Sequence, residues 1–107
     1  MSRARNQART RTALRSRQED SRRLLAELMR LTAQLDIELV REPIEEGRGG
    51  LCRIYDRRFL YVDPALPLLE QVDLFVEALA QLPTEHLYLR PRLRDRLERA
   101  RRRLCSG

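Results

Sequence analysis

The sequence predicts an α+β fold, in which a small antiparallel sheet of about three strands is packed by an N-terminal helix and a central helix, with a basic C-terminal helix. Three observations support this prediction. Apolar residues recur at helical spacing within residues 24–35, 68–82 and 93–104. Short runs rich in aliphatic and aromatic residues occupy residues 37–63. Prolines and glycines separate the helical segments from the strand segments.

The first helix is expected to begin near Ser16 and to end near Asp36. Ser16 and Glu19 have the spacing of a capping box, in which the two side chains satisfy backbone N–H groups of the first turn. Leucines then follow one another every three or four residues and form one apolar stripe. The residues of this stripe are Leu24, Leu28, Leu31 and Leu35.

Residues 1–17 form a basic arm in front of this helix. The arm contains six Arg and no acidic residue, and Leu14 is its one large apolar residue. Such a segment cannot bury enough apolar surface to offset the entropy lost on ordering. We therefore expect an arm that is flexible or forms a solvated helical extension, followed by a single domain over residues 18–107.

Three strands are expected at residues 37–42, 51–55 and 59–63. Pro43 and a glycine-rich stretch at residues 47–50 separate the first strand from the second. Only three polar residues lie between the second and third strands, which predicts a hairpin. Cys52 lies in the second strand and is expected to be a small buried residue.

The central helix is expected over about residues 67–82, with Pro67 at its start and Pro83 after its end. Asp63 or a nearby backbone group is expected to cap it. The C-terminal helix has a narrow apolar stripe and Arg on its other faces. We expect the core to contain Leu28, Leu31, Leu35, Ile54, Val62, Val72, Phe75 and Leu79.

Residues 49–81 resemble the core of the ImmA/IrrE-type metallopeptidase fold in their order of two glycines, a hairpin, a second strand ending in Val62-Asp63, and a helix. In that family the helix carries an HExxH motif, whose two His bind zinc and whose Glu activates a water. Residues 77–81 stand where the motif would be and read EALAQ, without either His and without the catalytic Glu. The resemblance therefore implies a related architecture and no zinc or peptidase activity.

No other combination of residues predicts catalysis. His86 is the single histidine of the chain, and neither cysteine lies at metal-ligand spacing from it. The glycine-rich loop at residues 47–50 is not followed by a helix, so it does not match a phosphate-binding loop. We expect no catalytic, metal-binding or cofactor-binding residues, and a protein that is not an enzyme.

The charges divide the chain into three parts. Residues 1–23 carry eight Arg and two acids, residues 24–89 carry six Arg and twelve acids, and residues 90–107 carry eight Arg and two acids. The basic ends predict a non-catalytic binding protein that engages an anionic partner. The expected contact residues are Arg9, Arg11, Arg92, Arg96, Arg99, Arg101, Arg102 and Arg103.

Several partners fit this pattern. RNA or DNA phosphates would bind both basic ends, and the leucine stripes would meet a protein partner or a second copy of the chain. A metallopeptidase-like fold without activity would serve as a protein-interaction module. Alternatively, the Arg side chains pair with the acidic centre of the same chain. No segment has the apolar length of a membrane span or the pattern of a signal peptide, so no membrane partner and a cytoplasmic location are expected.

Overall fold

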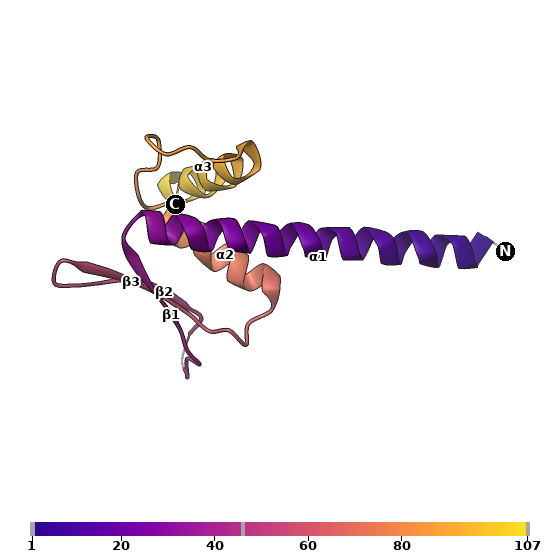
Figure 1. Cartoon of the computed structure of the whole chain (residues 1–107), viewed down its shortest axis with the longest axis horizontal. Helices are drawn as coiled ribbons and strands as arrows, with labels where there is room; N and C mark the ends of the chain where they lie inside the picture. Colours follow the sequence, from indigo (N-terminus) through magenta and orange to yellow (C-terminus); the bar gives the residue numbers. More distant parts are fainter. Residues whose placement is uncertain (1, 46, 107) are drawn as a thin grey trace.

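The computed structural model describes residues 2–45 and 47–106, with side chains described for residues 13–45 and 47–105. Three helices and three strands follow one another along the chain (Figure 1). They are α1 (Ser2–Gln34), β1 (Ile37–Arg41), β2 (Gly49–Ile54), β3 (Arg57–Val62), α2 (Leu68–Leu79) and α3 (Pro91–Ser106). The predicted α+β class, with its N-terminal, central and C-terminal helices, is confirmed.

Helix α1 begins well before Ser16, because the basic arm takes the helical one of its two predicted forms. It runs without a break for 33 residues, about 50 Å at 1.5 Å per residue. Ser16 and Glu19 lie inside it, so the predicted capping box is wrong. The Arg, Ala and Gln residues that precede Ser16 favour helix and give the helix no reason to stop there. The N-terminal half of α1 projects beyond the rest of the molecule (Figure 1).

The sheet is mixed, with strand order β1-β3-β2. Strands β2 and β3 form the predicted antiparallel hairpin, with Ile54 opposite Arg57 beside the turn. Strand β1 runs parallel to β3, so the prediction of an antiparallel sheet is wrong for this pair. Leu60 and Val62 make β3 the most deeply buried strand. It is also the central strand, with β1 on one side and β2 on the other.

Gly49 is required where β2 begins. A Cβ atom at this position would collide with the carbonyl oxygen of Tyr61 on β3, and the φ angle of Gly49 is +109°. At the same end of β3, the Asp63 carboxylate accepts hydrogen bonds from the backbone N–H groups of Ile44 (3.2 Å) and Ala65 (2.9 Å). Asp63 thus holds the corner after β3, whereas the N-cap position of α2 is Pro67, without a side-chain cap.

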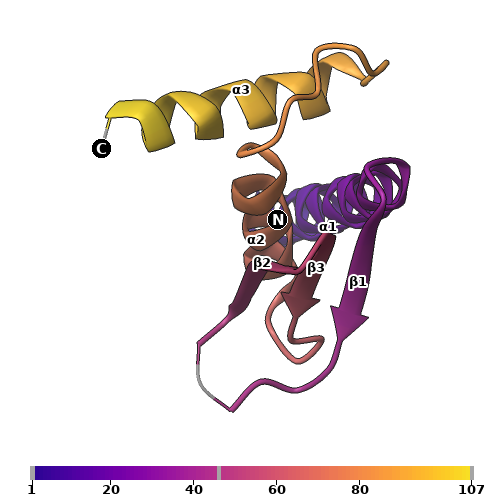
Figure 2. The same ribbon diagram turned by 90° about the vertical axis from the view of Figure 1, so that its left-hand side faces the viewer.

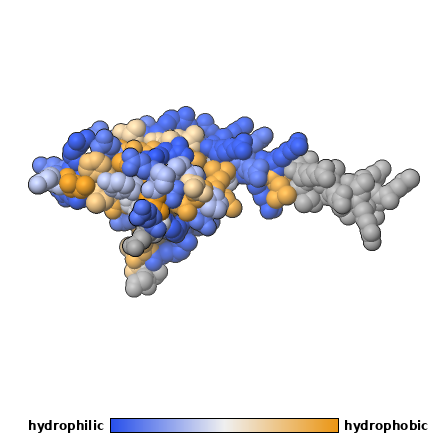
Figure 3. Space-filling view, turned by 90° about the horizontal axis from the view of Figure 1, so that it is seen from below, coloured by the Kyte–Doolittle hydropathy of each residue, from blue (hydrophilic) through white to orange (hydrophobic). Residues whose placement is uncertain are grey.

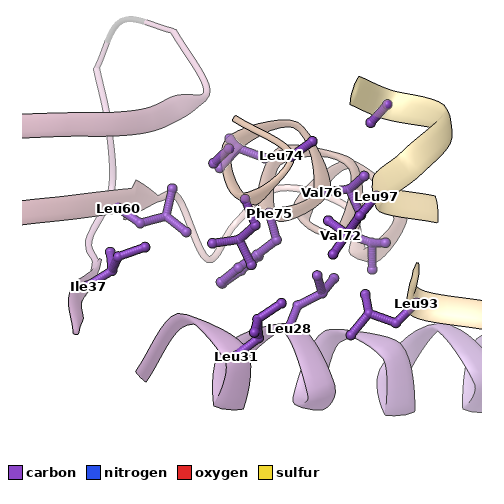
Figure 4. Packing of buried hydrophobic residues seen from close by; sticks show 14 of the residues in the cluster. Leu28, Leu31, Ile37, Leu60, Val72, Leu74, Phe75, Val76, Leu93 and Leu97 are labelled. Carbon is purple, nitrogen blue, oxygen red and sulfur yellow. The ribbon is translucent and has the colours of Figure 1, made fainter. Parts of the chain in front are cut away.

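The core lies between the sheet and the helices (Figure 4). Six of the predicted core residues are buried, and Leu35 packs against the edge of the core. The prediction is wrong for Ile54, which is 44% exposed because it lies beside the hairpin turn on the face away from the helices. The six confirmed core residues are Leu28, Leu31, Val62, Val72, Phe75 and Leu79.

All three helices lie on one side of the sheet (Figure 2). Helix α1 packs against β1 and α2, while α2 packs against β2, β3 and α3. Leu93, Leu97 and Ala100 bury one face of α3. The other faces of α3 are open to solvent, and most of its Arg side chains lie on them.

Candidate anion-binding site

The Arg residues of α3 are not spread evenly around the helix. Arg92, Arg96, Arg99 and Arg103 follow one another at intervals of four, three and four residues. Residues at this spacing share one face of an α-helix. We call these four residues the arginine stripe. The stripe lies beside the apolar face that contacts α2, so it borders the junction of the two helices.

A cleft of about 430 Å³ lies at this junction. Four Arg side chains and a single carboxylate, that of Asp73 on α2, line it. Arg96 donates to Asp73 across the cleft with a 3.1 Å distance between Nη2 and Oδ1. One carboxylate cannot balance four guanidinium groups, so the cleft is positively charged. Its Arg residues are Arg96, Arg99, Arg102 and Arg103.

Guanidinium groups suit phosphate and carboxylate ligands, because their planar N–H donors can bond two oxygens at once. Arg99 and Arg102 are the best placed for this role. Arg99 donates only to the backbone oxygen of Asp95, at 3.4 Å. Among the described side chains, neither Arg99 nor Arg102 makes an ion pair.

The N-terminal end of the stripe reaches α1. Arg92 pairs with Asp20 at 3.6 Å, and the neighbouring Arg90 pairs with Glu27 at 3.2 Å. Residues 13–19 of α1 are all exposed, so α1 leaves the domain close to Asp20. The basic arm therefore starts at the end of the arginine stripe. Arg9 and Arg11 belong to α1, but their side chains lie outside the described part of the structure.

Arg101 has a different role from its neighbours. Its guanidinium donates to the backbone oxygens of Ala80 (3.1 Å) and Leu82 (2.8 Å), where α2 ends. It also donates to Thr84 Oγ1 at 3.4 Å and to Glu85 Oε1 at 3.0 Å. These bonds satisfy carbonyl groups that the end of a helix leaves without partners. Arg101 is thus committed to the end of α2 and is not part of the cleft.

Glu85 has a lowered pKa in this arrangement. A hydrogen bond from its own backbone N–H has the largest effect, and the charge of Arg101 adds to it, although desolvation acts in the opposite direction. Because its pKa is lowered, Glu85 keeps its negative charge, and its ion pair with Arg101, to a lower pH than an ordinary Glu would.

Part of the basic C-terminus does pair with the acidic centre, as one of the predicted alternatives has it. Four Arg residues of this region make ion pairs with α1, α2 or the loop after α2. These pairs position α3 on the domain. These pairs do not include Arg99 or Arg102, which line the cleft.

On helix α2, Glu77 and Gln81 occupy the position of the motif discussed above. Glu77 and Gln81 are exposed, and the Gln81 amide donates to the backbone oxygen of Glu77 at 3.3 Å. They line a groove of about 310 Å³ between α2 and the start of β2. Within the described residues, no group of three His, Cys, Asp or Glu side chains could hold a metal ion.

The remaining reactive side chains lie apart from one another. His86 is exposed in the loop before α3, and Cys105 is exposed near the end of α3. Cys52 is exposed as well, so the prediction that it is buried is wrong. Its side chain lies on the face of the sheet that none of the described helices covers, because the preceding residue, Leu51, packs toward the helices.

The described surface has no broad apolar region on the side seen in Figure 3, where hydrophobic side chains lie among hydrophilic ones. No helix within the described residues is long and apolar enough to cross a membrane. Comparison with known proteins gave no match to a protein-family model, to a curated protein or to a solved structure.

Proposed function

We propose that this protein is a non-catalytic cytoplasmic binding protein, which engages an anionic partner through the cleft of α3 and the basic arm of α1. One observation carries the proposal: four Arg side chains surround a cleft that contains a single carboxylate, Asp73. Like charges repel when they gather in this way. A polyanion that fills the cleft would relieve the repulsion.

Nucleic acid is the partner that best uses both basic elements. The arm carries six Arg over its 17 residues, and it begins next to the arginine stripe. A phosphate backbone would contact the cleft and the arm together, because their charges adjoin. Phosphate contacts of this kind give high affinity with little sequence preference, and salt weakens them strongly.

The test compares two variants that lose the same charge. Arg99→Gln/Arg102→Gln changes the cleft, whereas Arg41→Gln/Arg58→Gln changes two exposed Arg residues of the sheet. Binding of labelled duplex DNA and duplex RNA is measured at low salt and at about 0.15 M salt. We expect the cleft variant to bind more weakly for all sequences and to lower the salt slope by about two. The sheet variant should bind almost as the parent does.

Two results would contradict the proposal. Equal loss in both variants would show that only net charge matters. Absence of binding by the parent at low salt would remove nucleic acid as a partner.

A second candidate function is that of a protein-interaction module with a metallopeptidase-like architecture. The observation that favours it is the groove lined by Glu77, Gln81 and the start of β2, a strand that pairs on one side only. An extended peptide could add to such a free strand edge. Glu77→Arg, at an exposed position, should then abolish binding to a peptide library and leave nucleic-acid binding unchanged. Peptide binding that the variant retains would exclude this groove.

A further inference from the structure

The sheet has one face that no helix covers. On the central strand β3, Leu60 and Val62 point toward the helices and are fully buried. Successive side chains of a strand point to opposite faces, so Phe59 and Tyr61 lie on the other side. Their neighbours on the flanking strands follow from the strand register. Glu38 and Cys52 flank Phe59, and Val40 and Gly50 flank Tyr61.

This face is separate from the hydrophobic core. Phe59, Tyr61 and Val40 are each partly exposed, and none of them packs against the core cluster. Cys52 and Ile54 on the same face are exposed. In Figure 2 the three described helices lie above or behind the sheet, and none of them lies in front of it. An aromatic pair on the middle strand is therefore open to solvent.

The two rings are neighbours on this face, and an Arg guanidinium lies over one of them. The ring centroids of Phe59 and Tyr61 are 6.3 Å apart, with an angle of 31° between the ring planes. The guanidinium of Arg57 lies 5.4 Å from the centroid of Phe59, and Glu38 holds it there through a 3.0 Å hydrogen bond. This position is typical of a cation–π contact.

Next to Tyr61, the face has free space. Gly50 has no side chain, and a Cβ atom built on it would meet no heavy atom within 4 Å. The ring of Tyr61 consequently has no side chain beside it in β2. A flat ligand would find room over Gly50.

We propose that Phe59 and Tyr61 form a stacking platform for unpaired bases of a single-stranded nucleic acid. Aromatic side chains stack with bases because both present flat π-faces, and exposed sheets use adjacent rings to hold two or three bases. Arg57 lies on the same face as the two rings, at the hairpin end of the platform, and supplies positive charge for the phosphates. This inference rests on the proposed function, since it specifies which nucleic acid the basic protein would prefer.

Three probes separate base stacking from phosphate binding: a thymidine oligonucleotide, an abasic oligonucleotide of the same length, and a DNA duplex. The platform should favour the thymidine strand, because only this probe has unpaired bases. Phe59→Leu/Tyr61→Leu removes both rings and retains apolar side chains. We expect it to weaken thymidine-strand binding about fivefold to a hundredfold per ring and to leave the other two probes unaffected.

The matched control is Tyr88→Leu, which removes an aromatic side chain that is 90% exposed and lies in the loop before α3. It should change none of the three affinities. The melting temperature of each variant is measured alongside, so that a loss of folding is not mistaken for a loss of stacking.

Cys52 provides a second readout at the platform itself, because it is directly opposite Phe59 in the hairpin. The thymidine strand should slow its reaction with a thiol reagent, while Cys105 on α3 remains reactive. This measurement needs no substitution in the platform, so it does not depend on the folding of a variant.

The possible outcomes are distinct. Equal affinity for the thymidine and abasic strands, with Cys52 still reactive, would overturn the platform and leave the proposed function standing. Preference for the thymidine strand that is lost in Phe59→Leu/Tyr61→Leu would support the platform. If duplex binding were also unchanged in Arg99→Gln/Arg102→Gln, the role of the cleft would be contradicted while the platform stands. If light scattering instead showed a dimer that this aromatic variant dissociates, without base preference in the parent, the face would be a self-association surface and the inference would fail.

Discussion

Two neighbouring Arg residues of α3 have different structural roles. Arg101 and Arg102 are adjacent in α3, yet Arg101 bonds the end of α2 and Arg102 lines the cleft. The difference arises from their angular positions on the helix. Arg101 lies next to the buried Ala100 and Leu97, so its side chain extends along the domain, whereas Arg102 points into the cleft.

Substitution of Arg101 should therefore affect stability. Arg101→Ala leaves the carbonyl groups of Ala80 and Leu82 without their donor, and bonds from a charged donor are worth about 1.5–3 kcal/mol each before screening by solvent. Because the Arg101 side chain is 31% exposed, we expect a total loss of about 1–3 kcal/mol in the free energy of unfolding. Urea denaturation measures it.

Arg102→Ala is the matched control and should change the free energy of unfolding by less than about 0.5 kcal/mol. Equal losses in the two variants would show that Arg101 does not secure the end of α2.

A second contrast concerns two apolar residues that the sequence places in the core. Phe75 is 1% exposed and Ile54 is 44% exposed. Phe75→Ala should lower the free energy of unfolding by about 3–5 kcal/mol, because a buried ring leaves a cavity. Ile54→Ala removes a side chain already in contact with water and should cost less than about 1 kcal/mol. Thermal denaturation of both variants measures the two losses. A loss of stability in Phe75→Ala as small as that in Ile54→Ala would contradict the packing of α2 described above.

At the level of elements, the sequence predicts what is local. The apolar spacing of α2 and α3 predicts both helices. The polar residues Asp56, Arg57 and Arg58 predict the hairpin, although its turn is Tyr55-Asp56 and both Arg residues belong to β3. The pairing of β1 with β3 is a contact between distant segments, and no short-range pattern contains it. The predicted helix start at Ser16 is wrong for another reason: the helix-forming residues on its N-terminal side outweigh the capping signal.

In the candidate site too, the local features are predictable from the sequence and the long-range contacts are not. The Arg content of α3 is evident in the sequence, and so is the basic arm. The cleft depends on Asp73, which belongs to α2 and meets Arg96 only because the two helices pack together. The aromatic platform could not be predicted either. Alternate side chains of β3 point to opposite faces of the sheet, but the sequence does not say which face the helices cover.

Deletion of residues 1–17 tests whether the arm is a separate element. The described side chains at its end, residues 13–17, are exposed, so the domain should lose little stability. We expect a change below about 1 kcal/mol in the free energy of unfolding. Binding to a DNA duplex should weaken, since six Arg are lost.

A large loss of stability on this deletion would mean that the arm packs on the domain. The comparison variant is Leu28→Ala, which changes α1 inside the core and should cost about 2–5 kcal/mol.

On the scale of the whole molecule, the two proposed surfaces lie on different sides of the core. The arm and the arginine stripe adjoin one another near Asp20, while the aromatic platform faces away from all three helices. A single strand that contacted both would have to wrap around the edge of the domain. Binding at the two surfaces is therefore separable, and variants of one should leave the other intact.

The shape of the molecule gives the last prediction. The radius of gyration over Cα atoms is 16.4 Å and the longest dimension is 62 Å, whereas a compact domain of this length has a radius of gyration of about 13 Å. The projecting part of α1 accounts for the difference. Its Arg side chains repel one another, and they have few apolar neighbours to hold the arm against the domain. Small-angle X-ray scattering should thus find an elongated particle, and removal of residues 1–17 should bring the radius of gyration to about 13 Å. A parent protein already at that value would show that the arm folds back onto the domain, where it would cover the end of the arginine stripe.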